Sequence, residues 1–168
     1  MRFKDTKDSP RYDFIDSYLA SENKEWPQLN DEDLWSWENG AVGDYAIALN
    51  GKTRAEGSRS TSAGSNNLSY GANSFTTGNF NLAFGESSVA EGSNTTAIGR
   101  GAHAEGIGTV AGDYNKPFED ENAPLASHAE GYNSIASGYG AHAEGGNNIA
   151  SGAYSHAGGF GNIANKEY

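Results

Sequence analysis

The sequence predicts an all-β protein, a solenoid in which each 14-residue coil contributes two short parallel strands. Glycine recurs every seven residues, at 57, 64, 71, 78, 85, 92, 99 and 106, and again at 131, 138, 145, 152 and 159. The residue two places before each of these glycines is Ala, Ser or Thr. In the second run, the residue three places before each glycine alternates between His and Ile, so the true period is fourteen.

Each heptad fits a strand of about four residues followed by a turn. Glycine suits the turn because it adopts positive φ without strain, whereas a glycine in every second turn would weaken a helix. Gly43 and Asn50 extend the pattern toward the N-terminus, since Asn is the other residue that tolerates a left-handed backbone. In a stack of such coils, each strand pairs with its equivalent in the coils above and below.

The alternation of side chains along a strand places the small residues on one face and their neighbours on the other. Small inward residues predict a thin, Ala-filled rod, and seven or eight coils at about 4.8 Å each make it roughly 35 to 40 Å long. Burial of methyl groups releases little free energy, so one roll needs further partner surface.

One set of strands carries outward apolar residues that would supply this surface. We expect them to line a symmetry axis between identical rolls, because so continuous an apolar ladder is unusual on a monomer. The predicted axis residues are Leu68, Tyr70, Leu82, Phe84, Ile98, Val110, Ile135, Ile149 and Ile163.

Residues 1–42 form a different segment, which we expect to be a short α-helical or irregular anchor. Residues 1–44 hold 11 acidic against 5 basic side chains and all three Trp. Five aromatic residues could cap the first coil or dock into another protein, and the sequence favours neither role: Phe14, Tyr18, Trp26, Trp35 and Trp37. The roll is then assigned to residues 43–168, with an inserted loop at 113–125 that is expected to be a surface excursion.

Composition excludes several classes of protein. A formal net charge of −11 repels phosphate backbones and anionic lipid, so nucleic acid and membranes are not expected as partners. The absence of Cys excludes disulfides and thiolate zinc sites. The opening residues MRFKDTKDSPRYDF lack an apolar stretch, so we expect neither a signal peptide nor membrane insertion. A disordered Gly/Ser/Asn linker is the alternative from composition alone, but a linker has no reason to keep glycine in phase.

Three His-x-Glu pairs are the candidate chemical site: His103/Glu105, His128/Glu130 and His142/Glu144. Imidazole and carboxylate are good metal ligands, but a repeated pair is more typical of a hydrogen-bonded ladder between coils, so no metal is predicted.

Glycoside hydrolysis would need two carboxylates in different environments. The repeat places the candidate carboxylates in similar environments: Glu91, Glu105, Glu130 and Glu144. We therefore predict a protein that is not an enzyme, without catalytic residues or cofactors.

Residues 87–106 (SSVAEGSNTTAIGRGAHAEG) and 127–159 resemble the head repeats of YadA-like trimeric autotransporter adhesins. The HAEG/IASG variant is similar to repeats of bacteriophage fibre proteins. The resemblance implies a left-handed parallel β-roll that assembles as a homotrimer. It also implies inward small residues at Ala90, Ala97, Ala104, Ala136 and Ala150, turn glycines at Gly92, Gly99 and Gly138, and axis residues at Ile98, Ile135 and Ile149.

The chain shows no signal peptide, coiled-coil stalk or C-terminal barrel of the autotransporters. We therefore predict a structural head fibre or tail fibre of a tailed bacteriophage, assembled in the host cytoplasm and displayed on the virion surface. Its expected partners are two further copies of the chain, a capsid or tail protein bound through residues 1–42, and a host surface glycan or protein. The alternatives are a fragment of a bacterial cell-surface adhesin and, third, a polysaccharide depolymerase.

Overall fold

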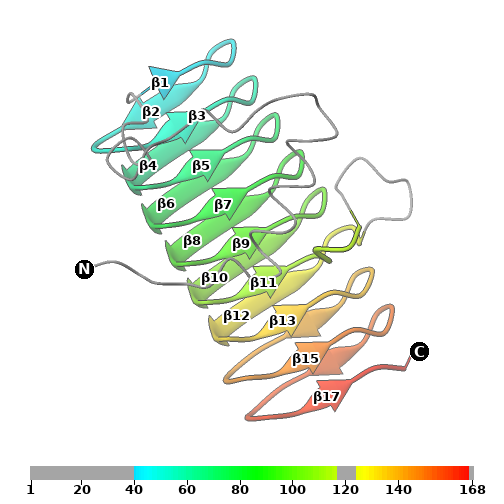
Figure 1. Cartoon of the computed structure of the whole chain (residues 1–168). Helices are drawn as coiled ribbons and strands as arrows, with labels where there is room; N and C mark the ends of the chain where they lie inside the picture. The colour runs from blue at the N-terminus through cyan, green and yellow to red at the C-terminus, as the bar shows by residue number, and fades with distance from the viewer. Residues whose placement is uncertain (1–39, 117–123, 167–168) are drawn as a thin grey trace.

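The computed structural model describes residues 40–116 and 124–166, and these residues form strands and turns only (Figure 1). Odd-numbered strands build a nine-stranded sheet and even-numbered strands an eight-stranded sheet. The first comprises β1 (Gly40–Ala41), β3 (Arg54–Ala55), β5 (Leu68–Ser69), β7 (Leu82–Ala83), β9 (Thr96–Ala97), β11 (Val110–Ala111), β13 (Ile135–Ala136), β15 (Ile149–Ala150) and β17 (Ile163–Ala164). The second comprises β2 (Ile47–Leu49), β4 (Thr61–Ser65), β6 (Phe75–Asn79), β8 (Val89–Ser93), β10 (His103–Ile107), β12 (His128–Tyr132), β14 (His142–Ala143) and β16 (His156–Ala157).

Successive strands alternate between the two sheets, so each pair of strands closes one coil, and the coils stack along one axis (Figure 1). All pairing between neighbouring coils is parallel and in register, as where Ala104 of β10 lies between Ala90 of β8 and Ala129 of β12. Ala129 is 25 residues beyond Ala104 instead of 14, because this coil contains the extra residues between β11 and β12. The predicted parallel solenoid with two strands per coil is confirmed.

The predicted inward column of small residues is also confirmed. Ala90, Ala97 and Ala104 are fully buried, and the column continues through Ala157. Toward the N-terminus the same column carries hydroxyls, and Thr76 Oγ1 lies 2.8 Å from Ser69 Oγ and 3.0 Å from Ser62 Oγ. The interior is therefore narrow, since no side chain in this column is larger than Thr.

The prediction that alanine fills the rod is wrong, because a second inward column is largely polar. It lies two residues before the first in every heptad, and its members are Thr53, Ser60, Asn67, Ser74, Asn81, Ser88, Thr95, Ala102, Thr109, Ser127, Ser134, Ala141, Asn148 and Ser155, all at most 2% exposed. Buried polar groups need hydrogen-bond partners. Asn81 finds four: its Nδ2 donates to the carbonyls of Thr77 (2.7 Å) and Gly92 (2.9 Å), and its Oδ1 accepts from Thr95 N (2.9 Å) and Oγ1 (2.8 Å).

The repeated glycines leave room for the backbone of the next coil, and every second one also has a left-handed backbone. Gly92, near the end of β8, has φ 107° and represents those that need a left-handed backbone, as predicted, and a Cβ there would also lie 2.1 Å from the carbonyl oxygen of Gly106. Gly71, in the opposite turn, does not have positive φ, but a Cβ there would lie 2.0 Å from the carbonyl oxygen of Gly85 in the next coil. Asn50 has φ 73°, so its expected left-handed conformation is confirmed.

Strand pairing begins at Gly40, which hydrogen-bonds to Thr53 O and aligns with Arg54 of β3. The predicted N-terminal helices and the five aromatic anchor residues, Phe14, Tyr18, Trp26, Trp35 and Trp37, lie outside the described residues. Within residues 40–116 and 124–166, no helix is long and apolar enough to cross a membrane.

Candidate functional site

The in-register stacking of coils turns each outward position of a strand into a ladder of side chains. Two ladders follow from the sequence. The imidazole–carboxylate ladder comprises His103, His128, His142 and His156 with Glu105, Glu130 and Glu144, and it lies on the eight-stranded sheet. The apolar ladder comprises the predicted axis residues and lies on the nine-stranded sheet.

The four imidazoles form a continuous stack on β10, β12, β14 and β16. Neighbouring ring centroids are 4.8 Å apart throughout, and the ring planes differ by only 3° to 11°. The first three His side chains are 36% exposed, whereas His156 at the end of the stack is 56% exposed. The spacing equals that of neighbouring strands, so the backbone sets the positions of the rings.

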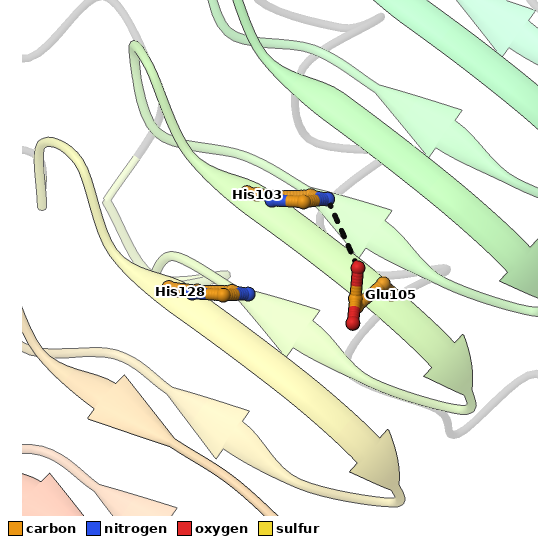
Figure 2. Close-up of side chains that lie close together, drawn as sticks. All are labelled: His103, Glu105 and His128. Carbon is orange, nitrogen blue, oxygen red and sulfur yellow. Dashed lines mark ion pairs between the residues drawn. The ribbon is translucent and has the colours of Figure 1, made fainter.

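The carboxylates lie on the same face, two residues beyond the imidazoles. Glu105 is 3.6 Å from Nε2 of His103 on its own strand (Figure 2), and Figure 2 also shows His128 on the next coil. Glu130 lies between two imidazoles: its Oε2 is 4.0 Å from Nε2 of His128, and its Oε1 is 3.9 Å from Nε2 of His142.

The partner of Glu144 differs from the pair read from the sequence. Its Oε1 lies 3.3 Å from Nε2 of His156 in the next coil, whereas His142 on the same strand is approached by Glu130. Pairing therefore runs partly within strands and partly between coils.

The imidazole nitrogens that face the carboxylates have no hydrogen bond. Nε2 of His103, His128 and His142 is sealed from solvent and has no hydrogen-bond partner. The distances of 3.6 to 4.0 Å to the carboxylates exceed hydrogen-bonding range. The hydrogen-bonded ladder that the sequence favoured is therefore not formed through these atoms.

Burial lowers the pKa of His128 below its ordinary value of 6.5, and the neighbouring imidazoles His103 and His142 lower it further. Glu130 and Glu105 act in the opposite direction but do not reverse the shift. His128 is consequently neutral at neutral pH, and a neutral imidazole nitrogen is able to bind a metal ion.

Two groups of three side chains bring potential ligand atoms within 4.8 Å of one another: His103, Glu105 and His128, and His128, Glu130 and His142. Neutral imidazole nitrogen and carboxylate oxygen are common ligands of zinc, copper and nickel. The ladder thus has the donor atoms of a metal site, repeated along the roll.

The apolar ladder is only partly open to solvent. Leu82, Phe84, Ile98 and Val110 are at most 8% exposed and form one cluster, against which Leu68, Tyr70, Ile135 and Tyr114 pack. The ladder then continues through the half-buried Ile149 to Ile163, which is 67% exposed. The structure therefore brings all nine predicted axis residues onto one sheet, with the apolar surface most open at the C-terminal end.

Sequence analysis missed a set of exposed aromatic residues at the edges of the roll. Tyr132 and Phe160 are joined through backbone bridges to Gly146, and the Phe160 ring lies over that glycine. Tyr139 and Tyr154 contact each other edge to face at 5.4 Å, in the opposite turn. The 14-residue spacing of Tyr132, Gly146 and Phe160 was a usable signal, but Tyr132 is the last residue of β12 and the other two lie outside the named strands, where side-chain alternation gives no direction.

Comparison with known families identifies YadA-like head repeats in this chain. The model of the YadA head domain repeat matches residues 82–102, 90–111 and 129–155, which include the centre of the apolar ladder and much of the imidazole–carboxylate ladder. The chain has no match among curated proteins. The predicted resemblance to YadA head repeats is confirmed, and neither comparison supports the resemblance to bacteriophage fibres.

Proposed function

We propose that this chain is a structural, adhesin-type protein that works as a homotrimer, with the apolar ladder at the shared axis. The observation that carries the proposal is the in-register apolar column on the nine-stranded sheet, which continues to the exposed Ile163. The YadA head repeats that match residues 82–111 and 129–155 support it.

Assembly follows from the composition of the interior. The inward columns contain Ala, Ser, Thr and Asn, whose burial contributes little hydrophobic free energy. Leu82, Ile98 and Val110 are already buried within one chain. The apolar surface still open on the nine-stranded sheet includes that of Ile135, Ile149 and Ile163. Covering these side chains with identical copies adds the hydrophobic free energy that the interior does not supply.

The role of such a trimer is mechanical display. Eight coils stacked at about 4.8 Å form a rod roughly 38 Å long, which would project from the surface that carries it. Three copies in each trimer, and many trimers on each surface, raise the avidity of weak attachment to a host glycan or protein. No chemical step is required of Glu105, Glu130 or Glu144, which occupy equivalent places in successive coils.

The matched repeats favour a bacterial cell-surface adhesin over the bacteriophage fibre expected from the sequence. A head or tail fibre would use the same trimeric rod, with residues 1–42 bound to a capsid or tail protein. This alternative rests only on the HAEG and IASG sequence motifs of the repeats. Immunogold labelling with antibodies against the roll separates the two: an adhesin labels the surface of producing cells, and a fibre labels virions.

Sedimentation equilibrium of the full chain at micromolar concentration tests the trimer. The expected mass is three times 17.7 kDa. Replacing Ile149 and Ile163 by Lys should shift the mass toward that of the monomer, because charges would face one another at the axis. Ile107→Lys, at a 55% exposed position on the eight-stranded sheet, is the matched control and should remain trimeric. A monomeric wild-type chain would overturn the proposal.

A further inference from the structure

We propose that the imidazole–carboxylate ladder binds one late first-row divalent metal ion per chain, with Zn²⁺ as the probe, through His128, Glu130 and His142. This site is separate from the apolar ladder and does not depend on the proposed adhesive function.

The first argument is the state of the donor atoms. Nε2 of His128 and of His142 is inaccessible to solvent and lacks a hydrogen-bond partner. An unsatisfied buried polar atom is costly, about 1 to 3 kcal/mol, so each such atom in a native structure calls for a partner. A metal ion would provide one for both nitrogens at once.

The second argument is distance. Nε2 of His128 and Nε2 of His142 lie 4.0 and 3.9 Å from the two oxygens of Glu130. These separations are too long for hydrogen bonds. Two ligands of a tetrahedral ion with bonds of about 2.0 to 2.1 Å lie roughly 3.3 Å apart, so an ion fits after the donors close by about half an ångström.

The two parallel rings must also tilt toward each other, because the potential ligand atoms are up to 4.8 Å apart. Both imidazoles are 36% exposed and Glu130 is 33% exposed, so these side chains have solvent beside them and room to move.

The third argument is charge. The ion-pair partners of Glu105, Glu130 and Glu144 among the described residues are imidazoles, so no Lys or Arg side chain there pairs with these carboxylates. Carboxylates stacked in register at the spacing of neighbouring strands repel one another. A divalent cation offsets this repulsion.

The choice between the two groups of ligands follows from the position of the carboxylate. Glu130 places one oxygen toward each of two imidazoles, whereas the close contact of Glu105 is with His103 (Figure 2). His128 belongs to both groups and presents a single Nε2. Both groups cannot be filled through His128 at once, which sets the stoichiometry at one ion per chain.

The test is equilibrium dialysis of the full chain, stripped with EDTA, against Zn²⁺, with metal analysis of the protein. The expected result is one zinc per chain. Loss of even an outer partner of a ligand weakens metal binding about 10- to 100-fold, so His128→Asn and Glu130→Gln should each weaken it at least about tenfold.

Two matched variants serve as controls. His156→Asn removes an imidazole from the exposed end of the same stack, and Glu91→Gln removes a carboxylate from β8, whose His position is occupied by Val89. Both should retain one zinc, and far-UV circular dichroism should be unchanged in all four variants. Binding well below one zinc per chain, or equal loss in test and control variants, would overturn the proposal.

Discussion

The Asn81 side chain is the most direct test of how the coils are held together. It is fully buried and makes four hydrogen bonds, of which three reach Gly92 and Thr95 in the next coil. Asn81→Ala leaves two carbonyls, a backbone N–H and a hydroxyl without this partner. Each buried polar group left without a hydrogen-bond partner costs about 1 to 3 kcal/mol. Water or a small relaxation of the structure can satisfy some of these groups, so the free energy of unfolding should fall by about 3 to 5 kcal/mol.

Urea unfolding monitored by circular dichroism measures this loss. With a slope of about 2 kcal/mol per molar, the midpoint should fall by roughly 1.5 to 2.5 M. Asn79→Ala, the same change at an exposed position two residues away, should alter stability by less than about 0.5 kcal/mol. Asn81→Asp preserves the volume but loses both donors, so it should be at least as damaging as Ala at neutral pH. An Asn81→Ala midpoint equal to that of Asn79→Ala would refute the claim that this side chain joins the coils.

Two further predictions concern close packing and charge. Gly71→Ala places a Cβ 2.0 Å from a backbone oxygen of the next coil and should lower the free energy of unfolding by at least about 3 kcal/mol, as measured in thermal melts. Gly51→Ala is the control, because a Cβ there has nothing within 4 Å, and it should change stability by less than about 0.5 kcal/mol. Equal effects of the two variants would contradict the stacking argument. Burial lowers the pKa of His128, so the unfolded chain binds its proton at higher pH than the folded chain, and stability should decline as the pH falls below 6.5. NMR titration of the protein after removal of metal with EDTA should give a titration midpoint for His128 below 6.5. A midpoint above 6.5 would show that burial does not dominate the pKa of His128.

The strands, the coil and the first inward column could be predicted from the sequence because each depends on local periodicity. Glycine every seven residues fixes the turns, and Ala, Ser or Thr two places earlier fixes the narrow interior. The second inward column could not be recognised from residue type, because Asn67 and Asn81 look like surface residues in a sequence. They are buried because their amides satisfy backbone groups of the neighbouring coil, which only the stacked structure provides.

The two kinds of glycine show the same limit. Gly71 and Gly92 occupy equivalent places in the sequence repeat, but only Gly92 has positive φ, whereas a Cβ at either residue would lie 2.0 to 2.1 Å from a carbonyl oxygen of the next coil. Local propensity describes the first requirement. The second depends on how closely the backbones of successive coils approach at both turns, which the spacing of glycines does not encode.

In-register stacking also determines which outward residues form stable ladders. Repetition brings identical side chains to the spacing of neighbouring strands, which favours stacked Ile residues, such as Ile135 and Ile149, and disfavours stacked carboxylates. The Glu column begins at Glu91, beside Val89, runs beside the imidazoles from Glu105 to Glu144, and stops at Gly158, the residue that follows β16 where Glu144 follows β14. The carboxylate oxygens lie 3.3 to 4.0 Å from the Nε2 atoms of the imidazoles. Aliphatic residues at the same positions would stack without repulsion, and the cation proposed for His128, Glu130 and His142 would offset the repulsion between the carboxylates.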